Sequence, residues 1–213
     1  MDLKQLTVKE FDKAAQQFDD NSISVYNLCR KDYPHILKEI DSEPWESVLD
    51  AGCGTGAVLY LLHEKYPGKS YTGIDLSEKM IDTARNKNID GAIFVQGDCE
   101  ELPFESGLFD VVICSQSFHH YTRPEMFFDS VSRVLKPNGR LILRDMSMPL
   151  AAVRWFVNHI EMKLINHLLR KGDVRVYSKE EVDELCRHSG MKLEKFEYQR
   201  RFRMQCVCRK NKS

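Results

Sequence analysis

The sequence has no apolar run approaching the roughly 20 residues that a bilayer-spanning helix needs. Its first residues lack the apolar stretch of a secretory signal, and its seven cysteines form neither a CxxC pair nor a zinc-finger spacing. Lys and Arg total 31 against 32 Asp and Glu, so the cation excess of a general nucleic-acid binder is missing. These absences favour a cytoplasmic protein with reduced thiols, no metal, no membrane span and no nucleic-acid partner.

What the chain does contain is enough apolar material for one large domain. Its 213 residues are 42% hydrophobic and 30% charged, with no internal repeat and no flexible linker. We therefore expect a single domain over residues 1–213. Its expected parts are an N-terminal helical cap (1–45), a ligand-binding core (46–148), a helical lid insertion (149–176) and a C-terminal helix with a β-hairpin (177–213).

Short apolar runs alternate with helical patterns from residue 46 onward. Strands are expected at 47–50, 70–75, 92–96, 111–115 and 140–145, and the helices between them are expected to end near residues 66, 85 and 136. This alternation predicts βαβ units, and hence an α/β fold with a Rossmann-like, doubly wound, mostly parallel sheet. In such sheets ligands bind at the carboxyl ends of the strands, where the strand order reverses.

The two ends of the chain depart from this alternation. Helices are expected at 8–18 and 22–40, with Pro34 breaking or kinking the second. Near the other end, Ser178 and Glu181 form a capping box for a helix that ends at Gly190. Apolar runs at 191–198 and 201–208 then predict an antiparallel hairpin that completes a seven-stranded sheet.

Residues 150–170 carry apolar side chains at helical spacing and predict one long helix. These side chains are Leu150, Val153, Val157, Ile160, Leu164 and Leu168. We expect this stripe to pack over the pocket as a lid, which would suit an acceptor with an apolar body. A helix that merely covers the sheet edge and a helix at a dimer interface remain alternatives, so both a monomer and a homodimer are open.

The most informative stretch is VLDAGCGTG at residues 48–56, where a strand ends in three glycines at alternate positions and a helix follows. Glycine is needed where the backbone turns sharply and where a ligand approaches closer than a Cβ allows. The spacing is GxGxG rather than the GxGxxG of dinucleotide sites, and no GK[ST] follows for a triphosphate. Asp50, just before the glycines, would repel a pyrophosphate and would suit a ligand with positive charge.

Acidic residues follow the next two strands. Asp75 lies 23 positions after Gly52, where a carboxylate can accept two ribose hydroxyls. Asp98 follows the third strand, where it can accept from the exocyclic amine of adenine or cap the turn that leads to Pro103. Asp75 could equally hold the ribose of NAD, so an NAD-dependent oxidoreductase is an alternative, although Asp50 and the GxGxG spacing count against it.

Five motifs in order, VLDAGCGTG, GIDLS, GDCEELPF, FDVVICSQSFHH and LKPNGRLIL, resemble those of class I S-adenosylmethionine (SAM)-dependent methyltransferases. The resemblance covers about residues 46–145 and is to the broad group that includes the quinone-biosynthesis methyltransferases. It implies SAM as cofactor, S-adenosyl-L-homocysteine as product, and a small-molecule acceptor methylated on a C, O or N atom. A non-catalytic SAM-binding protein on the same fold is the other reading.

The resemblance implies which residues contact the methionine end of SAM. Asp50, Gly52 and Gly54 would line it, with Asp50 near the amino group. Ser115 and Gln116, at the end of the fourth expected strand, would flank it close to the point of methyl delivery.

The resemblance also implies contacts to the nucleoside. Asp75 would hold the ribose, while Leu76 and Met80 would contact the adenine. Asp98 would accept from the adenine amine, and the backbone of Cys99 would bond a ring nitrogen.

His119 and His120 lie just beyond the fourth strand, at the edge of the expected pocket. Methyl transfer from a sulfonium needs alignment and exclusion of water, and it needs a general base only if the acceptor must lose a proton. A histidine has the right pKa for that base, so both residues are catalytic candidates, with a supporting structural role as the alternative. Phe11, Phe18 and Tyr26 are expected to form another wall of the pocket.

Overall fold

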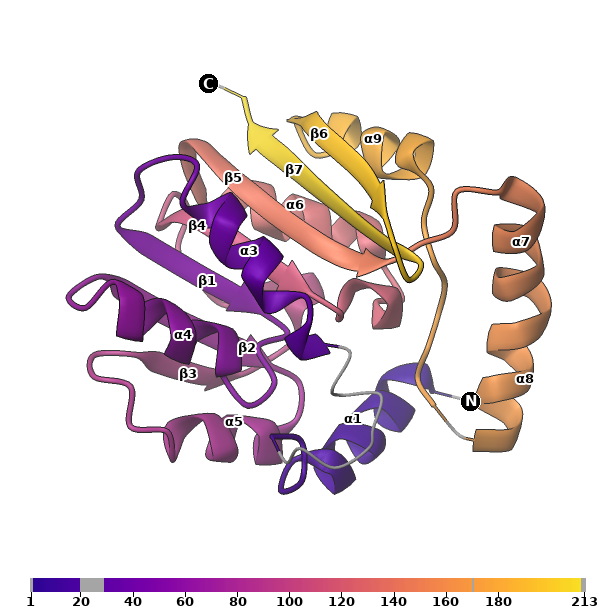
Figure 1. Ribbon diagram of the computed structural model, residues 1–213, viewed down its shortest axis with the longest axis horizontal. Helices are drawn as coiled ribbons and strands as arrows, with labels where there is room; N and C mark the ends of the chain where they lie inside the picture. The colour runs from indigo at the N-terminus through magenta and orange to yellow at the C-terminus, as the bar shows by residue number, and fades with distance from the viewer. Residues whose placement is uncertain (1, 20–28, 170, 212–213) are drawn as a thin grey trace.

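The computed structural model, which describes residues 2–19, 29–169 and 171–211, is built around one β-sheet (Figure 1). Its strands are β1 (Ser47–Ala51), β2 (Ser70–Asp75), β3 (Ile93–Gln96), β4 (Phe109–Ser115), β5 (Leu135–Met146), β6 (Met191–Gln199) and β7 (Arg203–Lys210). Their spatial order is β3-β2-β1-β4-β5-β7-β6. The first five strands pair in parallel, whereas β7 is antiparallel to both β5 and β6. The expected Rossmann-like, mostly parallel seven-stranded sheet with a C-terminal hairpin is therefore confirmed.

Helices cover both faces of the sheet (Figure 1). One face carries α3 (Tyr33–Ile40), α4 (Ala57–Lys65) and α5 (Glu78–Arg85), and the other carries α6 (Pro124–Val134) and α9 (Lys179–His188). Side chains of each strand alternate between the two layers, so that in β4 Ile113 packs under the first set of helices and Cys114 under the second. Because both faces are covered, the central strands β1 and β4 are almost continuously apolar, whereas the edge strand β6 alternates between buried and exposed residues.

The predicted caps explain where two of these helices begin. The Ser77 hydroxyl accepts a hydrogen bond from the Met80 amide at the start of α5. Ser178 and Glu181 form the expected capping box at the start of α9. These local side-chain bonds satisfy backbone amides that the first helical turn leaves without partners.

The expected helix boundaries in the N-terminal cap were wrong. The helix expected at 8–18 is α1 (Leu3–Ala14), because Asp2 caps it by accepting from the amides of Lys4 and Gln5. Of the helix expected at 22–40, residues 22–28 lie outside the described residues. The rest differs because Pro34 lies in the first turn of α3, where its missing amide proton costs no hydrogen bond.

The helix expected to end near residue 136 ends at Val134, and the turn-forming residues Pro137, Asn138 and Gly139, which precede the strand expected at 140–145, are an irregular part of β5. The pairing with β4 jumps from Phe109 opposite Leu135 to Val111 opposite Arg140. Asn138 adopts a φ of 62° within that step. The turn residues thus form a bulge at the start of the strand instead of a separate loop.

The long helix expected at 150–170 is present, but its apolar stripe does not pack as predicted. It consists of α7 (Ala151–Phe156), a π-helical turn (Val157–Glu161) and α8 (Met162–Leu169). Of the six stripe residues only Val157 is buried, and the other five are at least 41% exposed. Polar bonds fix the opposite face: the Asn158 side chain bonds the backbone N–H and C=O of Val176, and Asn166 Nδ2 donates to the Asp173 carbonyl.

A buried ion cluster ties the N-terminal cap to the C-terminal hairpin. The carboxylate of Asp32, which is 3% exposed at the start of α3, lies 2.7 Å from Arg144 Nε in β5 and 3.2 Å from Arg203 Nε in β7. Arg144 Nη1 also donates to the side-chain oxygens of Gln199 and Gln205. One buried carboxylate is therefore shared by two buried guanidinium groups.

We expect Asp32→Ala to lower the free energy of unfolding by about 3–5 kcal/mol, because it leaves two buried cations without a counter-charge. Urea unfolding followed by circular dichroism measures the change. The matched control is Asp183→Ala, which removes the exposed i,i+4 partner of Arg187 and should cost less than about 1 kcal/mol. Equal losses in the two variants would contradict a structural role for the buried cluster.

Candidate functional site

A cavity of about 620 Å³ lies at the carboxyl ends of β1, β2 and β4, where the strand order reverses. Each of the twelve residues predicted for the site lines it: Asp50, Gly52, Gly54, Asp75, Leu76, Met80, Asp98, Cys99, Ser115, Gln116, His119 and His120. The fold thus brings residues from four successive βα connections to one place. Their individual roles stay predictions.

The glycine loop after β1 folds back against the end of β2. The amides of Gly52 and Cys53 donate to the Ile74 carbonyl at 2.9 and 3.0 Å. Gly52 has a φ of 77°, and a Cβ built on it would lie 2.1 Å from Ser117 Oγ. A side chain is therefore excluded at Gly52 by Ser117, whereas a Cβ on Gly54 would have only Met80 Sδ within 4.0 Å, so the loop leaves space over Gly54 that a ligand can occupy.

The Asp75 carboxylate joins the first two loops. Its Oδ2 accepts from the Gly54 amide and its Oδ1 from the Ser77 amide, both at 2.9 Å. Burial raises the pKa of Asp75 even though these amides favour the charged form. Each carboxylate oxygen has a further lone pair with which it can accept from a ligand hydroxyl in the cavity.

Asp50 supplies a second buried carboxylate. It is 2% exposed, and burial first, with the nearby charge of Asp75 second, raises its pKa to about 7. A carboxylate held in such surroundings gains most from a cation, which restores the charged form. This part of the cavity therefore favours a ligand with a positive group.

Two polar atoms at the carboxyl end of β4 are buried at the cavity without a partner among the described residues. Ser115 Oγ and Gln116 Nε2 have no hydrogen bond to any of the described residues. Gln116 also adopts a left-handed backbone with a φ of 52°, which is unfavourable for a residue with a Cβ. Buried polar groups are normally paired, so these two atoms point to a polar ligand that would complete them.

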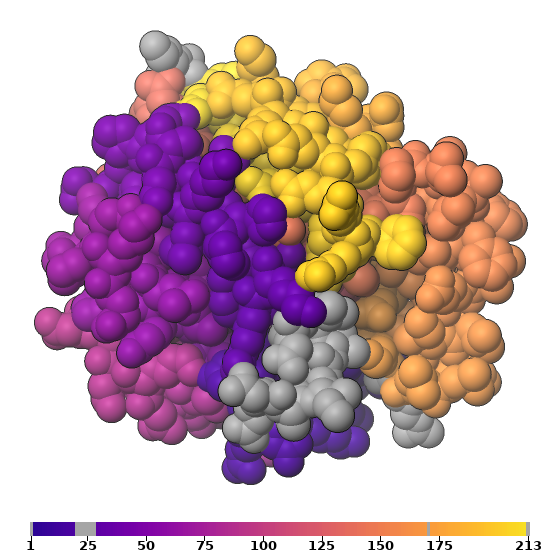
Figure 2. Space-filling model, in the orientation of Figure 1, coloured from indigo at the N-terminus to yellow at the C-terminus, as the bar shows by residue number. Residues whose placement is uncertain are grey.

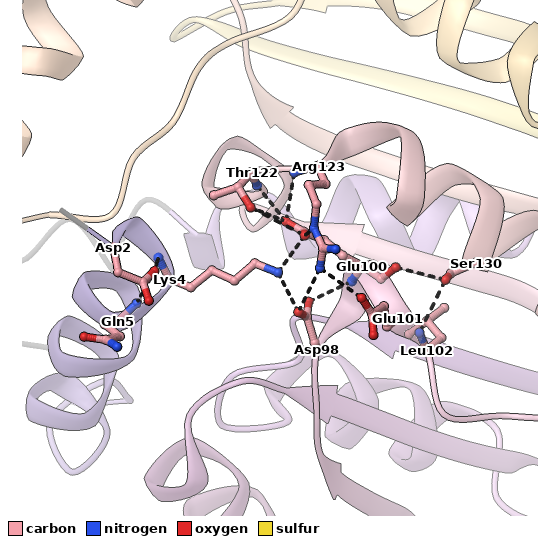
Figure 3. Close-up of polar contacts among 10 residues, drawn as sticks. All are labelled: Asp2, Lys4, Gln5, Asp98, Glu100, Glu101, Leu102, Thr122, Arg123 and Ser130. Atoms are coloured by element: carbon pink, nitrogen blue, oxygen red, sulfur yellow. Dashed lines mark hydrogen bonds and ion pairs between the residues drawn. The ribbon is translucent and has the colours of Figure 1, made fainter.

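Asp98 is engaged by protein groups as well as facing the cavity (Figure 3). Its Oδ1 accepts from the Glu100 amide at 2.9 Å and so caps the short 3-10 helix Cys99–Glu101. Its Oδ2 lies 2.6 Å from Lys4 Nζ, which also contacts Glu100 Oε2 at 2.6 Å. Asp98 therefore does act as a cap. A contact with an adenine amine would use the lone pairs of its carboxylate that these bonds leave free.

Glu100 is the centre of this network and was missed by the sequence motifs. Its side chain is fully buried and accepts from the amides of Thr122 and Arg123 at 2.6 and 3.0 Å and from Arg123 Nε at 2.8 Å. Burial alone would raise the pKa of Glu100, but the bonds from Lys4 and Arg123 outweigh it and hold the pKa at about 2. No local pattern marks Lys4 as a partner, since it lies 96 positions away in sequence.

His119 is fixed by the carboxylate at the end of β5. Its Nδ1 lies 2.6 Å from Asp145 Oδ1, and its backbone amide donates to Asp145 Oδ2 at 3.0 Å. Burial alone would lower the pKa of His119, but the Asp145 carboxylate outweighs burial and raises it. Because Nδ1 contacts Asp145, Nε2 is the ring nitrogen that can contact a ligand. It lies 3.7 Å from Asp173 Oδ1.

His120 has the opposite electrostatic character. Burial, and then the neighbouring charge of His119, lowers its pKa to about 4, so it is neutral at pH 7. Its ring meets Phe11 edge-on with centroids 5.2 Å apart, and its Nδ1 lies 3.3 Å from Asp173 Oδ1. Among the described residues, one group has ligand atoms close enough to hold a metal ion: His119, His120 and Asp173, whose ligand atoms lie within 4.8 Å of one another. The sequence predicts no metal.

The rest of the cavity wall is largely apolar. Phe11 and Phe18 line it as expected, whereas Tyr26 lies outside the described residues. The helix formed by α7, the π-helical turn and α8 (residues 151–169), which we call the lid segment, contributes Val157, Met162 and Ile165. Sequence periodicity missed these last two because the π-helical turn shifts the inward face away from the predicted stripe. The cavity therefore has an acidic, polar end and an apolar end, with the two histidines among its lining.

Comparison with known proteins gives one matching family model and several curated relatives. The model, described as a methyltransferase domain, matches residues 49–143. The demethylmenaquinone methyltransferase of Thermotoga maritima is 32% identical over 147 residues, which cover 68% of this chain and 64% of that protein. The fatty-acid O-methyltransferase of Mycolicibacterium smegmatis is 40% identical over 99 residues, which cover 46% of this chain and 36% of that protein. Both relatives are thus matched over less than two thirds of their own length.

A solved structure extends the likeness to nearly the whole chain. The PH0226 protein of Pyrococcus horikoshii OT3 superposes with a TM-score of 0.73 and covers 95% of this chain and 99% of that chain. Its sequence is 24% identical, so this likeness shows the fold and leaves activity to be argued from the site.

The Glu100 network predicts a change in acid stability. We expect Glu100→Gln to lower the free energy of unfolding at pH 7 by about 2–3 kcal/mol, because the folded pKa of about 2 lies below the ordinary 4.5. The sign follows from the lowered pKa: the stabilisation is present above pH 4.5 and is lost as the pH falls toward 2. Urea unfolding at pH 7 and pH 3 measures it.

The matched control is Glu101→Gln, since Glu101 lies in the same turn and contacts the same arginine but is 61% exposed. It should change stability little at either pH. A difference between wild type and Glu100→Gln that is as large at pH 3 as at pH 7 would contradict the assigned charge state of Glu100.

Proposed function

We propose, from the membership of this chain in the class I SAM-dependent methyltransferase family, that it transfers the methyl group of SAM to a small molecule with an apolar body. The observation that carries the proposal is the single cavity, in which buried carboxylates and unpaired polar atoms share one space with an apolar wall and two histidines. In this proposal the cap, core, lid and C-terminal hairpin act as one domain.

The residues at the polar end fit the amino-acid part of SAM. Asp50 would face its ammonium group, and the bare backbone of Gly52 and Gly54 would leave room for the chain that carries the sulfonium. Ser115 Oγ and Gln116 Nε2, which lack partners in the described protein, would bond its polar atoms. An NAD pyrophosphate would instead bring negative charge to the buried Asp50, which counts against the oxidoreductase alternative.

The nucleoside would lie along the ends of β2 and β3. Asp75 would accept the ribose hydroxyls on the lone pairs that the loop amides leave free. Leu76 and Met80 would contact the adenine ring, Asp98 its exocyclic amine, and the backbone of Cys99 a ring nitrogen. Lys4 would keep the Asp98 carboxylate in place for that contact.

SAM supplies an electrophilic methyl group on a positively charged sulfur, so the protein itself has to align the acceptor and exclude water. The lid residues Val157 and Met162 and the wall residue Phe11 would do both. Where the acceptor must lose a proton, His119 would accept it at Nε2. Asp145 would then stabilise the imidazolium, because it already holds Nδ1 at 2.6 Å.

The apolar wall supports an acceptor with a long or ring-shaped apolar body. The names of the two curated relatives, a demethylmenaquinone and a fatty-acid methyltransferase, agree with that substrate class. The methylated atom, C, O or N, depends on the acceptor and not on the cofactor half of the cavity. Seven free cysteines, six of them buried, support a cytoplasmic location, where thiols stay reduced.

The cofactor is tested by titration calorimetry. We expect S-adenosyl-L-homocysteine to bind with micromolar affinity and NAD not to bind, and Asp75→Ala to weaken the former at least about tenfold through loss of charge-assisted hydrogen bonds. Asp90→Ala, at an exposed carboxylate, is the control, and thermal unfolding verifies that each variant is folded. Binding of NAD alone would move the function to an oxidoreductase, and unchanged affinity in folded Asp75→Ala would contradict the ribose position.

The base is tested by kinetics with an acceptor found by screening quinols, phenols, fatty acids and amines for S-adenosyl-L-homocysteine release. We expect His119→Asn to keep the affinity for S-adenosyl-L-homocysteine and to lower kcat by about 100-fold or more. In wild type, kcat/KM should rise with pH through the raised pKa of His119, because the base acts only when unprotonated.

His120→Asn is the matched variant for this test, since His120 lines the same cavity and is neutral at pH 7. It should retain cofactor binding and a pH profile of wild-type shape. A folded His119→Asn with unchanged kcat would show that His119 only supports the wall, and binding without turnover of any acceptor would favour the non-catalytic SAM-binding alternative.

A further inference from the structure

The outward surface of the lid segment is apolar, the reverse of an ordinary surface helix. Its exposed side chains recur along the helix at Trp155, Phe156, Ile160, Leu164, Leu168 and Leu169. Each of these six, which we call the lid face, is between 44% and 66% exposed. Scattered apolar residues on a surface need no explanation, but a continuous set on one helix marks an interaction site.

The inward surface of the same segment carries the polar groups that a surface helix would normally show to water. Asn158 and Asn166 bond backbone groups of the following chain, and Arg154 Nη1 donates to the Met148 carbonyl at 2.8 Å. These bonds hold the helix with the lid face outward. The side chains of the lid face are therefore exposed because these bonds set the orientation of the helix.

The tip of the β6–β7 hairpin adds to this surface. Phe202 is 62% exposed, and its carbonyl accepts from the amide of Ser147, which lies between β5 and α7. The hairpin tip thus lies beside the start of the lid segment, and Figures 1 and 2 show the yellow hairpin next to the orange helix at one margin of the molecule. Arg200 and Arg201 directly precede Phe202 in sequence, and both are exposed.

Cations outnumber carboxylates on this surface. Lys163 is exposed between the apolar residues of the helix, and the hairpin tip adds Arg200 and Arg201. Glu161 is the one carboxylate among residues 150–169; it is exposed and also lines the cavity. The surface therefore joins aromatic and leucine side chains with cations, the composition that suits an anionic, partly apolar partner.

We propose that the lid face and the hairpin tip dock on the surface of a membrane that contains anionic lipid. The aromatic and leucine side chains would enter the boundary between headgroups and acyl chains, while Lys163 and the hairpin arginines would remain at the anionic headgroups. The docking is peripheral, since no helix in the described part of the chain is long and apolar enough to cross a bilayer.

A second copy of the chain is the less suitable occupant. A two-fold dimer places the same predominantly positive surface against itself, so Lys163, Arg200 and Arg201 would meet cations with only Glu161 to pair them. An anionic bilayer meets the same positive charges with opposite charge. The apolar residues alone would fit either a second copy or a bilayer. The excess of positive charge favours the anionic bilayer.

The membrane assignment also specifies the acceptor, in a step that rests on the proposed function. Val157, Met162 and Ile165 line the cavity from the inward side of the same helix whose outward side would touch lipid. One helix thus separates the apolar end of the cavity from the bilayer. An acceptor that resides in the membrane, with an apolar tail and a polar head to be methylated, would reach the cavity past this helix.

The exposed tryptophan provides a direct measurement. The chain has two tryptophans, of which Trp45 is 5% and Trp155 58% exposed. We expect vesicles of phosphatidylcholine and phosphatidylglycerol to shift the fluorescence emission to shorter wavelength and to sediment the protein, and vesicles of phosphatidylcholine alone to do so more weakly. Phe156→Ser/Leu164→Ser keeps the reporter and should weaken the partitioning about tenfold or more.

The matched control is Ile93→Ser/Leu108→Ser, which removes two apolar residues that are 59% and 44% exposed elsewhere on the molecule and should leave partitioning unchanged. Arg201→Glu should reduce binding to the anionic vesicles selectively. Absence of any shift or sedimentation, or equal partitioning of Phe156→Ser/Leu164→Ser and wild type, overturns the proposal.

A dimer found by analytical ultracentrifugation, without vesicle binding and abolished by Phe156→Ser/Leu164→Ser, would assign the surface to a second copy instead. Calorimetry with S-adenosyl-L-homocysteine on the same samples separates the two hypotheses. Cofactor binding without vesicle binding overturns only the docking surface, and vesicle binding without cofactor binding overturns only the proposed function.

Discussion

The carboxylate of Asp75 is the contact on which the polar half of the cavity depends. Two backbone amides, one from the glycine loop after β1 and one from the loop after β2, end on its two oxygens. Because neither loop has regular secondary structure at that point, this shared acceptor fixes their distance and orientation. The buried Asp50, the bare backbone of Gly52 and the start of α5 then lie around one space, and the elevated pKa of Asp50 follows from the burial and the second carboxylate beside it.

A second set of charges attaches the N-terminal cap to that space. Lys4 bridges Asp98 and the fully buried Glu100, and Glu100 is bonded in turn by the chain that follows the histidines (Figure 3). The cap helix α1 is therefore held by the same residues that lie at the expected adenine position. A rearrangement of the cap would therefore alter the surroundings of Asp98. The position of α1 and the electrostatics of the expected nucleoside site are coupled through Lys4.

The lid segment is held in a different way, because polar bonds act together with a small apolar cluster of Val157, Met162 and Val176. Asparagine side chains anchor its inward face, a π-helical turn shifts Met162 and Ile165 toward the cavity, and the remaining apolar side chains point outward. The same helix thus supplies an apolar wall to the proposed acceptor site and an apolar, basic surface to the outside. If both proposals hold, one helix contributes to the choice of substrate and to the location of the protein.

The sequence by itself determined the parallel sheet, its hairpin and the residues that gather at its carboxyl edge, because hydrophobic periodicity, caps and glycine spacing are local signals. It could not determine that Lys4 meets Glu100 or that His119 is held by Asp145, since these partners lie 96 and 26 positions apart and no local pattern joins them. It also showed that residues 150–170 have an apolar stripe but not which way the stripe faces. Only the tertiary structure decided that, because the direction depends on the distant backbone groups to which Asn158 and Asn166 bond.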